Sequence, residues 1–212
     1  MNTLIELDNI YLKSFNKIFE KLQESYINIE NNYHFDLNKT EVTEAIIQRL
    51  KVYYLTQGKI KDFLNKRYLA AASDYFVETI LFFLKLYLKE LGNNLEVHSE
   101  RQIRKNKNSI RPDISIWNGD EVVAIIECKT QLGWNRDNWE QQYLDRHIKL
   151  QTEFPNAKSL LLVMTGVNWG GFGNHIDLRQ NYFCLLKNTW PVDFTTSDQI
   201  MTPIEDMFKL LK

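Results

Sequence analysis

The chain has 212 residues, 44% hydrophobic and 25% charged, so it is long enough for one substantial globular domain and has the composition of one. Its net charge of −1 excludes the overall basicity that would by itself indicate a polyanionic partner, and any nucleic-acid-binding surface must come from local clusters. The two cysteines, Cys128 and Cys184, form no closely spaced pair and indicate free thiols rather than a disulfide framework or a zinc site.

The first third of the chain is predicted to be helical. Apolar residues recur at three- and four-residue spacing over 3–26, and polar residues interrupt the pattern over 30–38. A second helix is expected over 40–55, ended by Gln57 and Gly58. We therefore expect residues 1–67 to form a helical N-terminal region that packs on a core domain of residues 68–212.

A third helix is predicted over 73–91, with Gly92 as its C-terminal stop. Eleven of the fourteen residues in 75–88 are apolar or aromatic, which is typical of a buried central helix. The same stretch is shorter than the ~20 residues that span a bilayer and contains Glu78 and Lys85. The N-terminal residues lack the basic region of a signal peptide. We expect a cytoplasmic protein without membrane association.

Strand patterns begin after residue 94. Strands are predicted over 95–98, 113–117 and 121–129, the last two as a hairpin around Asn118 and Gly119. A helix over 137–154, stopped by Pro155, leads to the apolar strand 159–164, and a further strand at 182–186 precedes a last helix at 203–211. The order of elements predicts one α/β domain with a mixed sheet flanked by helices.

Two carboxylates and a lysine lie on the predicted hairpin. Asp113 stands at its start, and Glu127 and Lys129 share a strand face near its end because alternate strand residues point the same way. A two-residue loop would put Asp113 and Glu127 on opposite faces. A three-residue loop would instead pair Asp113 with Ile125 and place Glu127 diagonally at roughly 7–8 Å on the same face. A joint site therefore requires an odd loop or a bulge.

This grouping suits metal-assisted phosphodiester hydrolysis. Carboxylate oxygens are the ligands that Mg²⁺ prefers. A bound metal ion acidifies water and offsets the negative charge that develops on phosphoryl oxygens. A neighbouring lysine can orient or deprotonate the attacking water, or stabilise the transition state. In a surface hairpin the same residues would be no more than solvated charges.

The dipeptide Pro112-Asp113, followed after thirteen residues by Glu127-Cys128-Lys129, resembles the PD-(D/E)XK nuclease superfamily, which includes many type II restriction endonucleases. The resemblance implies a restriction-endonuclease-like core of helix, three strands, helix and strand. It implies Asp113 and Glu127 as Mg²⁺ ligands (Mn²⁺ can substitute) and Lys129 as the catalytic lysine. Many members add an acid from the preceding helix, and Glu78 is the candidate. A carboxylate on so apolar a helix is costly unless it is paired or bound to a cation.

A basic segment directly precedes Asp113. It contributes five positive charges within eleven residues and no acid, which favours phosphate contacts over a merely solvated loop. Two polar residues on the expected helix 137–154, Gln142 and Arg146, are candidates to orient a phosphate or a water, or to pack at the surface. The DNA-binding candidates are therefore Arg101, Arg104, Lys105, Lys107, Arg111, Gln142 and Arg146.

Together these patterns predict a Mg²⁺-dependent DNA endonuclease of restriction or defence type. Because cutting both strands usually needs two active sites, we expect a homodimer, with the N-terminal helices or the last helix as candidate interfaces. A structure-specific repair or junction-resolving nuclease is the alternative among enzymes. A non-catalytic DNA-binding module that retains the nuclease fold is the alternative from another class.

Overall fold

The structure is a computed structural model that describes residues 2–104, 109–132, 139–167 and 174–211. The chain divides into two compact units, Met1–Phe35 and Asp36–Lys212. Helix α1 (Leu4–Asn32) makes up most of the first unit and runs to the polar residues that were expected to interrupt it. Among the described helices, none is both long and apolar enough to cross a membrane.

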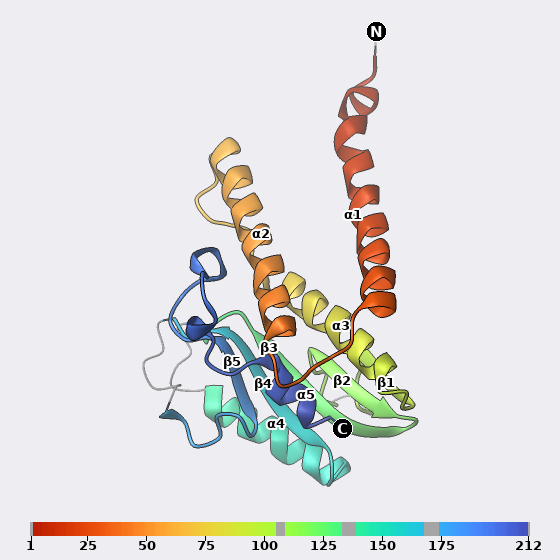
Figure 1. Cartoon of the computed structure of the whole chain (residues 1–212), viewed down its shortest axis with the longest axis vertical. Helices are drawn as coiled ribbons and strands as arrows, with labels where there is room; N and C mark the ends of the chain where they lie inside the picture. The colour runs from red at the N-terminus through yellow and green to blue at the C-terminus, as the bar shows by residue number, and fades with distance from the viewer. Residues whose placement is uncertain (1, 105–108, 133–138, 168–173, 212) are drawn as a thin grey trace. The chain divides into compact units, whose positions relative to one another are not determined.

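The second unit is an α/β domain. Its sheet has the order β1-β2-β3-β4-β5, in which β1, β2 and β3 are antiparallel neighbours and β3, β4 and β5 are parallel neighbours (Figure 1). The expected mixed sheet is therefore present. The strands are β1 (Leu95–Ser99), β2 (Ile114–Asn118), β3 (Glu121–Lys129), β4 (Lys158–Thr165) and β5 (Tyr182–Leu186).

Helix α2 (Glu41–Phe63) belongs to this second unit, whereas the sequence had grouped it with an N-terminal region ending at residue 67. Its N-terminus is held by the buried side chain of Glu205 on α5 (Ile204–Lys209), which accepts hydrogen bonds from Val42 N at 2.8 Å and Thr43 N at 3.1 Å. The predicted stop at Gly58 is wrong. Gly58 is accommodated inside the helix, where a single glycine costs only about 1 kcal/mol relative to alanine.

Helix α3 (Ser73–Glu90) begins at the predicted residue and ends one residue before the prediction, just ahead of Gly92, whose φ of +63° suits a C-terminal stop. It contacts β1 and β3. Half of its side chains are buried, as expected for a central helix, but Glu78 is exposed. The idea that Glu78 is a buried acid in need of a partner is therefore wrong.

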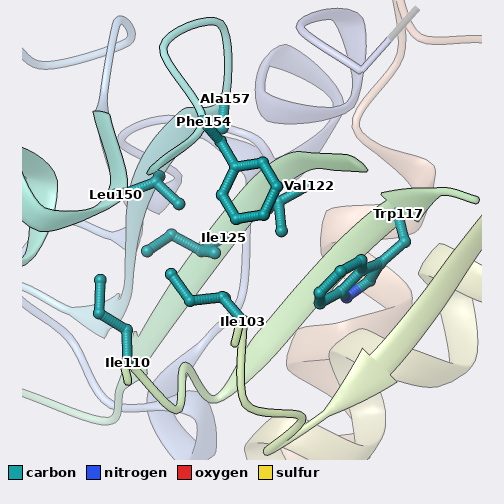
Figure 2. Packing of buried hydrophobic residues seen from close by; sticks show 8 residues of the cluster. All are labelled: Ile103, Ile110, Trp117, Val122, Ile125, Leu150, Phe154 and Ala157. Atoms are coloured by element: carbon teal, nitrogen blue, oxygen red, sulfur yellow. The ribbon is translucent and has the colours of Figure 1, made fainter. Parts of the chain in front are cut away.

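Helix α4 (Trp139–Glu153) connects β3 to β4 and lies along one face of the sheet (Figure 1). Leu150 and Phe154 at its C-terminal end pack against Trp117, Val122 and Ile125 of the hairpin. Figure 2 shows this cluster, which also includes residues from the segment before β2 and from the loop after α4: Ile103, Ile110 and Ala157. The packing fixes α4 across the hairpin.

The hairpin of β2 and β3 contains the predicted bulge. Asn118 pairs with Glu121, so the loop is the two-residue pair Gly119-Asp120, and Gly119 adopts φ +60° as such a turn requires. The ladder then shifts by one residue between Trp117, opposite Val122, and Ile116, opposite Ala124. Because of this shift, residues at the start of β2 share a sheet face with different residues of β3 than they would in a regular hairpin.

Candidate active site

The bulge brings Asp113 and Glu127 to the same face. Ile114 pairs with Ile126, and continuing this register places Asp113 directly opposite Glu127 rather than opposite Ile125. The expected shared face is confirmed, while the expected diagonal pairing is wrong because the shift comes from the bulge instead of a three-residue loop. The two carboxylates therefore stand side by side where β3 ends.

The backbone around Asp113 is held from both sides. Its carbonyl oxygen accepts hydrogen bonds from Ser99 Oγ at 3.0 Å and from Glu100 N at 3.3 Å, at the end of β1. Its side-chain Oδ2 accepts a hydrogen bond from Cys128 N at 2.7 Å. These contacts fix the carboxylate against β3 even though Asp113 itself lies just outside β2.

Lys129 lies between the two carboxylates. Its Nζ is 3.6 Å from Asp113 Oδ2 and 3.5 Å from Glu127 Oε2. The lysine side chain is 47% exposed, whereas Glu127 is only 5% exposed. Each carboxylate thus directs one oxygen at the same cationic group, which is reachable from solvent.

Arg146 of α4 binds the other oxygen of Glu127. Its guanidinium donates a hydrogen bond to Glu127 Oε1 and forms an ion pair with it. A buried carboxylate needs such partners, since an unpaired buried charge is strongly unfavourable. The sequence identified Arg146 as a candidate for phosphate or water, but gave no signal for its contact with Glu127, because that contact depends on how α4 crosses the sheet.

Glu78 lines the same cleft as Asp113 and Lys129. The cleft has a volume of about 590 Å³ and lies between α3 and the ends of β1 and β3. Within the described part of the chain, however, no three acidic, histidine or cysteine side chains come together closely enough to hold a metal ion. Glu78 therefore shares the cleft with Asp113 and Lys129 without completing a three-ligand set, and Glu127 lies buried behind Lys129 rather than in the lining.

Cys128 does not take part in the chemistry of the cleft as a nucleophile. It lies between Glu127 and Lys129 in sequence, and its side chain is buried. Burial raises the pKa of the Cys128 thiol, and the neighbouring Asp113 carboxylate raises it further. A thiol in this environment stays protonated and unreactive at neutral pH.

Two arginines of the basic segment before β2 make packing contacts. Arg101 stacks over the Trp117 ring at 3.8 Å, and its Nη1 donates a hydrogen bond to His98 Nε2 at 2.8 Å. Arg104 stacks over the Phe154 ring at 4.3 Å and pairs with Glu153 at 3.0 Å. The two arginines thus help pack the hairpin and α4, roles that the sequence did not indicate.

Among the DNA-binding candidates, Arg111 and Gln142 are exposed. For both, the described residues provide no side-chain hydrogen bond or ion-pair partner. Arg111 lies two residues before Asp113 in the sequence. Lys105 and Lys107 lie outside the described residues.

The chain matches no protein-family model, no curated protein and no solved structure. Its function is therefore inferred from the residues and their geometry.

Proposed function

We propose that this chain is a Mg²⁺-dependent endodeoxyribonuclease of restriction or defence type, with a restriction-endonuclease-like core. The observation that carries the proposal is the position of Lys129 Nζ, 3.6 Å from Asp113 Oδ2 and 3.5 Å from Glu127 Oε2. Two carboxylates and a lysine at the end of one hairpin are the groups that phosphodiester hydrolysis with a divalent cation requires.

The two carboxylates fit a divalent cation. Asp113 Oδ2 and Glu127 Oε2 both approach the Lys129 ammonium, so one oxygen of each carboxylate lies close to a single positive position. Oxygen ligands from one or two carboxylates, with the rest of the shell left to water, are the usual protein contribution to Mg²⁺. Asp113 and Glu127 would hold the ion, and Glu78, which lines the cleft with Asp113, would be a further ligand. The ion supplies acidification of water and charge neutralisation.

The chain's own residues have separate tasks in this proposal. Lys129 places a positive charge beside the scissile phosphate and orients the attacking water. Arg146 holds Oε1 of Glu127 and leaves Oε2 directed at Lys129. Arg111, exposed beside Asp113, contacts a backbone phosphate of the DNA.

Plasmid cleavage with Mg²⁺ or Mn²⁺ tests the proposal. We expect cutting by the wild type and loss of cutting in Asp113→Asn and Lys129→Gln, with DNA binding largely retained. Glu121→Gln, at the opposite and exposed end of β3, is the matched control and should cut normally. Discrete fragments would support a restriction enzyme, and cuts that depend on branched or damaged DNA would support a repair or junction-resolving nuclease. Normal cutting by Lys129→Gln would overturn the assignment of the site.

A second candidate function is a DNA-binding module without catalysis. It is favoured by the ion pairs of Glu127 with both Lys129 and Arg146, which neutralise the carboxylate without any metal ion. DNA binding with no cleavage in Mg²⁺, Mn²⁺ or Co²⁺, on both linear and branched substrates, would select this function over the nuclease.

A further inference from the structure

Helix α1 exposes an extensive apolar surface. It is 29 residues long, begins with a complete capping box at Thr3 and Glu6, and has no buried residue. Eleven of its large hydrophobic side chains are between 44% and 83% exposed: Leu4, Ile5, Leu7, Ile10, Tyr11, Leu12, Phe15, Ile18, Phe19, Leu22 and Ile27. A contiguous apolar surface of this size marks an interaction site.

Most of these side chains follow a seven-residue repeat. One row holds Ile5, Leu12, Phe19 and Tyr26, each seven residues from the next. A second row, three residues further along, holds Asp8, Phe15, Leu22 and Ile29. Rows with this spacing form the a and d seam of a coiled coil, in which seven of the eight positions here are apolar. A third row, Leu4, Tyr11 and Ile18, widens the stripe, while Leu7, Ile10 and Ile27 lie outside it.

We infer that α1 pairs with α1 of a second copy of this chain in an antiparallel helical dimer. The pairing is independent of the proposed nuclease activity, since it involves none of the residues of the cleft.

The surface is large enough for a stable dimer. Each of Tyr11, Phe15 and Phe19 can bury on the order of 150 Å² or more. Together with the aliphatic side chains of the stripe, they reach the ~800 Å² per partner of a stable protein interface. A membrane surface fits less well, because α1 has three lysines against five acids and membrane-surface helices carry a basic polar face.

The order of residues along the two rows favours the antiparallel orientation. In this orientation, Ile5 lies opposite Ile29 of the second copy and Leu12 lies opposite Leu22. Phe15 lies opposite Phe19, so that three of the four layers pair identical residue types, and each pair occurs twice about the twofold axis. A parallel dimer would instead bring two copies of Asp8 together in the seam, where like charges are unfavourable. The antiparallel pairing places Asp8 opposite Tyr26.

The flanks of the stripe allow the helices to approach. The row next to the seam carries uncharged amides at Asn9, Asn16 and Gln23. Lys17 and Glu24 lie on the side away from the seam. Thus no row of like charges along the seam faces its copy, and repulsion between the helices is small.

The mass of the full chain tests the inference. Sedimentation equilibrium should give a dimer for the wild type at micromolar concentration. The double variant Phe15→Asp/Leu22→Asp should dissociate at least 100-fold more readily. Lys17→Asp, which introduces the same residue on the far side of α1, is the matched control and should remain dimeric. A wild type that is monomeric at all concentrations, or a dimer unaffected by the double variant, would overturn the inference.

Crosslinking tests the orientation with the same chain. Cys128 and Cys184 are buried, so an introduced cysteine is the reactive thiol. Under mild oxidation, Ile5→Cys alone should stay uncrosslinked, whereas a mixture of Ile5→Cys and Ile29→Cys chains should form disulfide-linked dimers. Efficient crosslinking of Ile5→Cys with itself would show a parallel dimer and overturn the proposed arrangement. Both measurements stand whether or not the chain cuts DNA.

Discussion

Arg146 of α4 and Glu127 of β3 form an ion pair that joins the helix to the end of the strand. Because Glu127 is only 5% exposed, Arg146→Ala leaves a carboxylate oxygen buried without its partner. Such a loss costs about 1–3 kcal/mol of folding free energy. Cleavage should fall roughly 10- to 100-fold, the usual effect of removing a group that orients a metal ligand.

Arg146→Lys and Lys149→Ala sharpen this experiment. The lysine variant keeps the charge and should recover part of both stability and cleavage. Lys149 is exposed on the same helix, and its replacement should leave both unchanged. If Arg146→Ala cut DNA at the wild-type rate while being destabilised, Arg146 would serve only to pack α4.

In the proposed site, Lys129 and a divalent cation would compete for the same two carboxylate oxygens. Replacing Lys129 by alanine should therefore raise the affinity for Mn²⁺ or Ca²⁺ roughly 30-fold, since two charge contacts near 4 Å are each worth about 1 kcal/mol in a water-like environment. Cleavage should be lost at the same time. Isothermal titration of wild type and Lys129→Ala measures the affinity. Asp113→Asn, which removes a ligand, should shift it in the opposite direction, and equal affinities in all three proteins would contradict a cation site here.

Arg111 and Arg101 should differ in their effect on DNA binding. Arg111 is exposed and, among the described residues, has no side-chain partner. Arg111→Ala should therefore weaken DNA binding and reduce the slope of log K against log salt concentration by about one. Arg101 stacks on Trp117, so Arg101→Ala should mainly lower stability, by about 0.5–1 kcal/mol. Fluorescence anisotropy at several salt concentrations, with thermal unfolding, separates the two. Equal salt slopes for wild type and Arg111→Ala would remove Arg111 from the DNA surface.

The predictable part of the structure was the part with strong periodicity or a definite chemical requirement. The apolar runs of α3 and β4 followed from residue spacing. Spacing alone left open whether Asp113 and Glu127 share a face. The catalytic interpretation required a shared face and therefore predicted an odd loop or a bulge, and the bulge is present. The length of α2 did not, because packing in the core outweighs the weak local preference of Gly58.

Contacts between distant segments were not predictable. Arg146 meets Glu127, and Arg104 meets Phe154, only because α4 crosses the hairpin at a particular angle. Likewise, the exposure of Glu78 depends on which side of α3 faces the cleft. Sequence spacing gives the residues that share a helix or strand face, but not the partner that faces them.

Glu205 provides a pH-dependent contribution to stability that is separate from the cleft. Burial raises the pKa of this carboxyl, outweighing the hydrogen bonds from Thr43 and Val42 that favour the charged form. A carboxyl group whose pKa is higher in the folded state than in the unfolded state, where it is about 4.3, adds most to the free energy of unfolding below pH 4.3. This contribution is lost as the pH rises through the pKa of the folded state. The unfolding free energy of the wild type should therefore fall relative to Glu205→Gln as the pH increases above about 4.3. Urea unfolding at several pH values measures the difference, with Asp206→Asn as the neighbouring control. A difference that stays constant with pH would show that the pKa of Glu205 is the same in the folded and unfolded states.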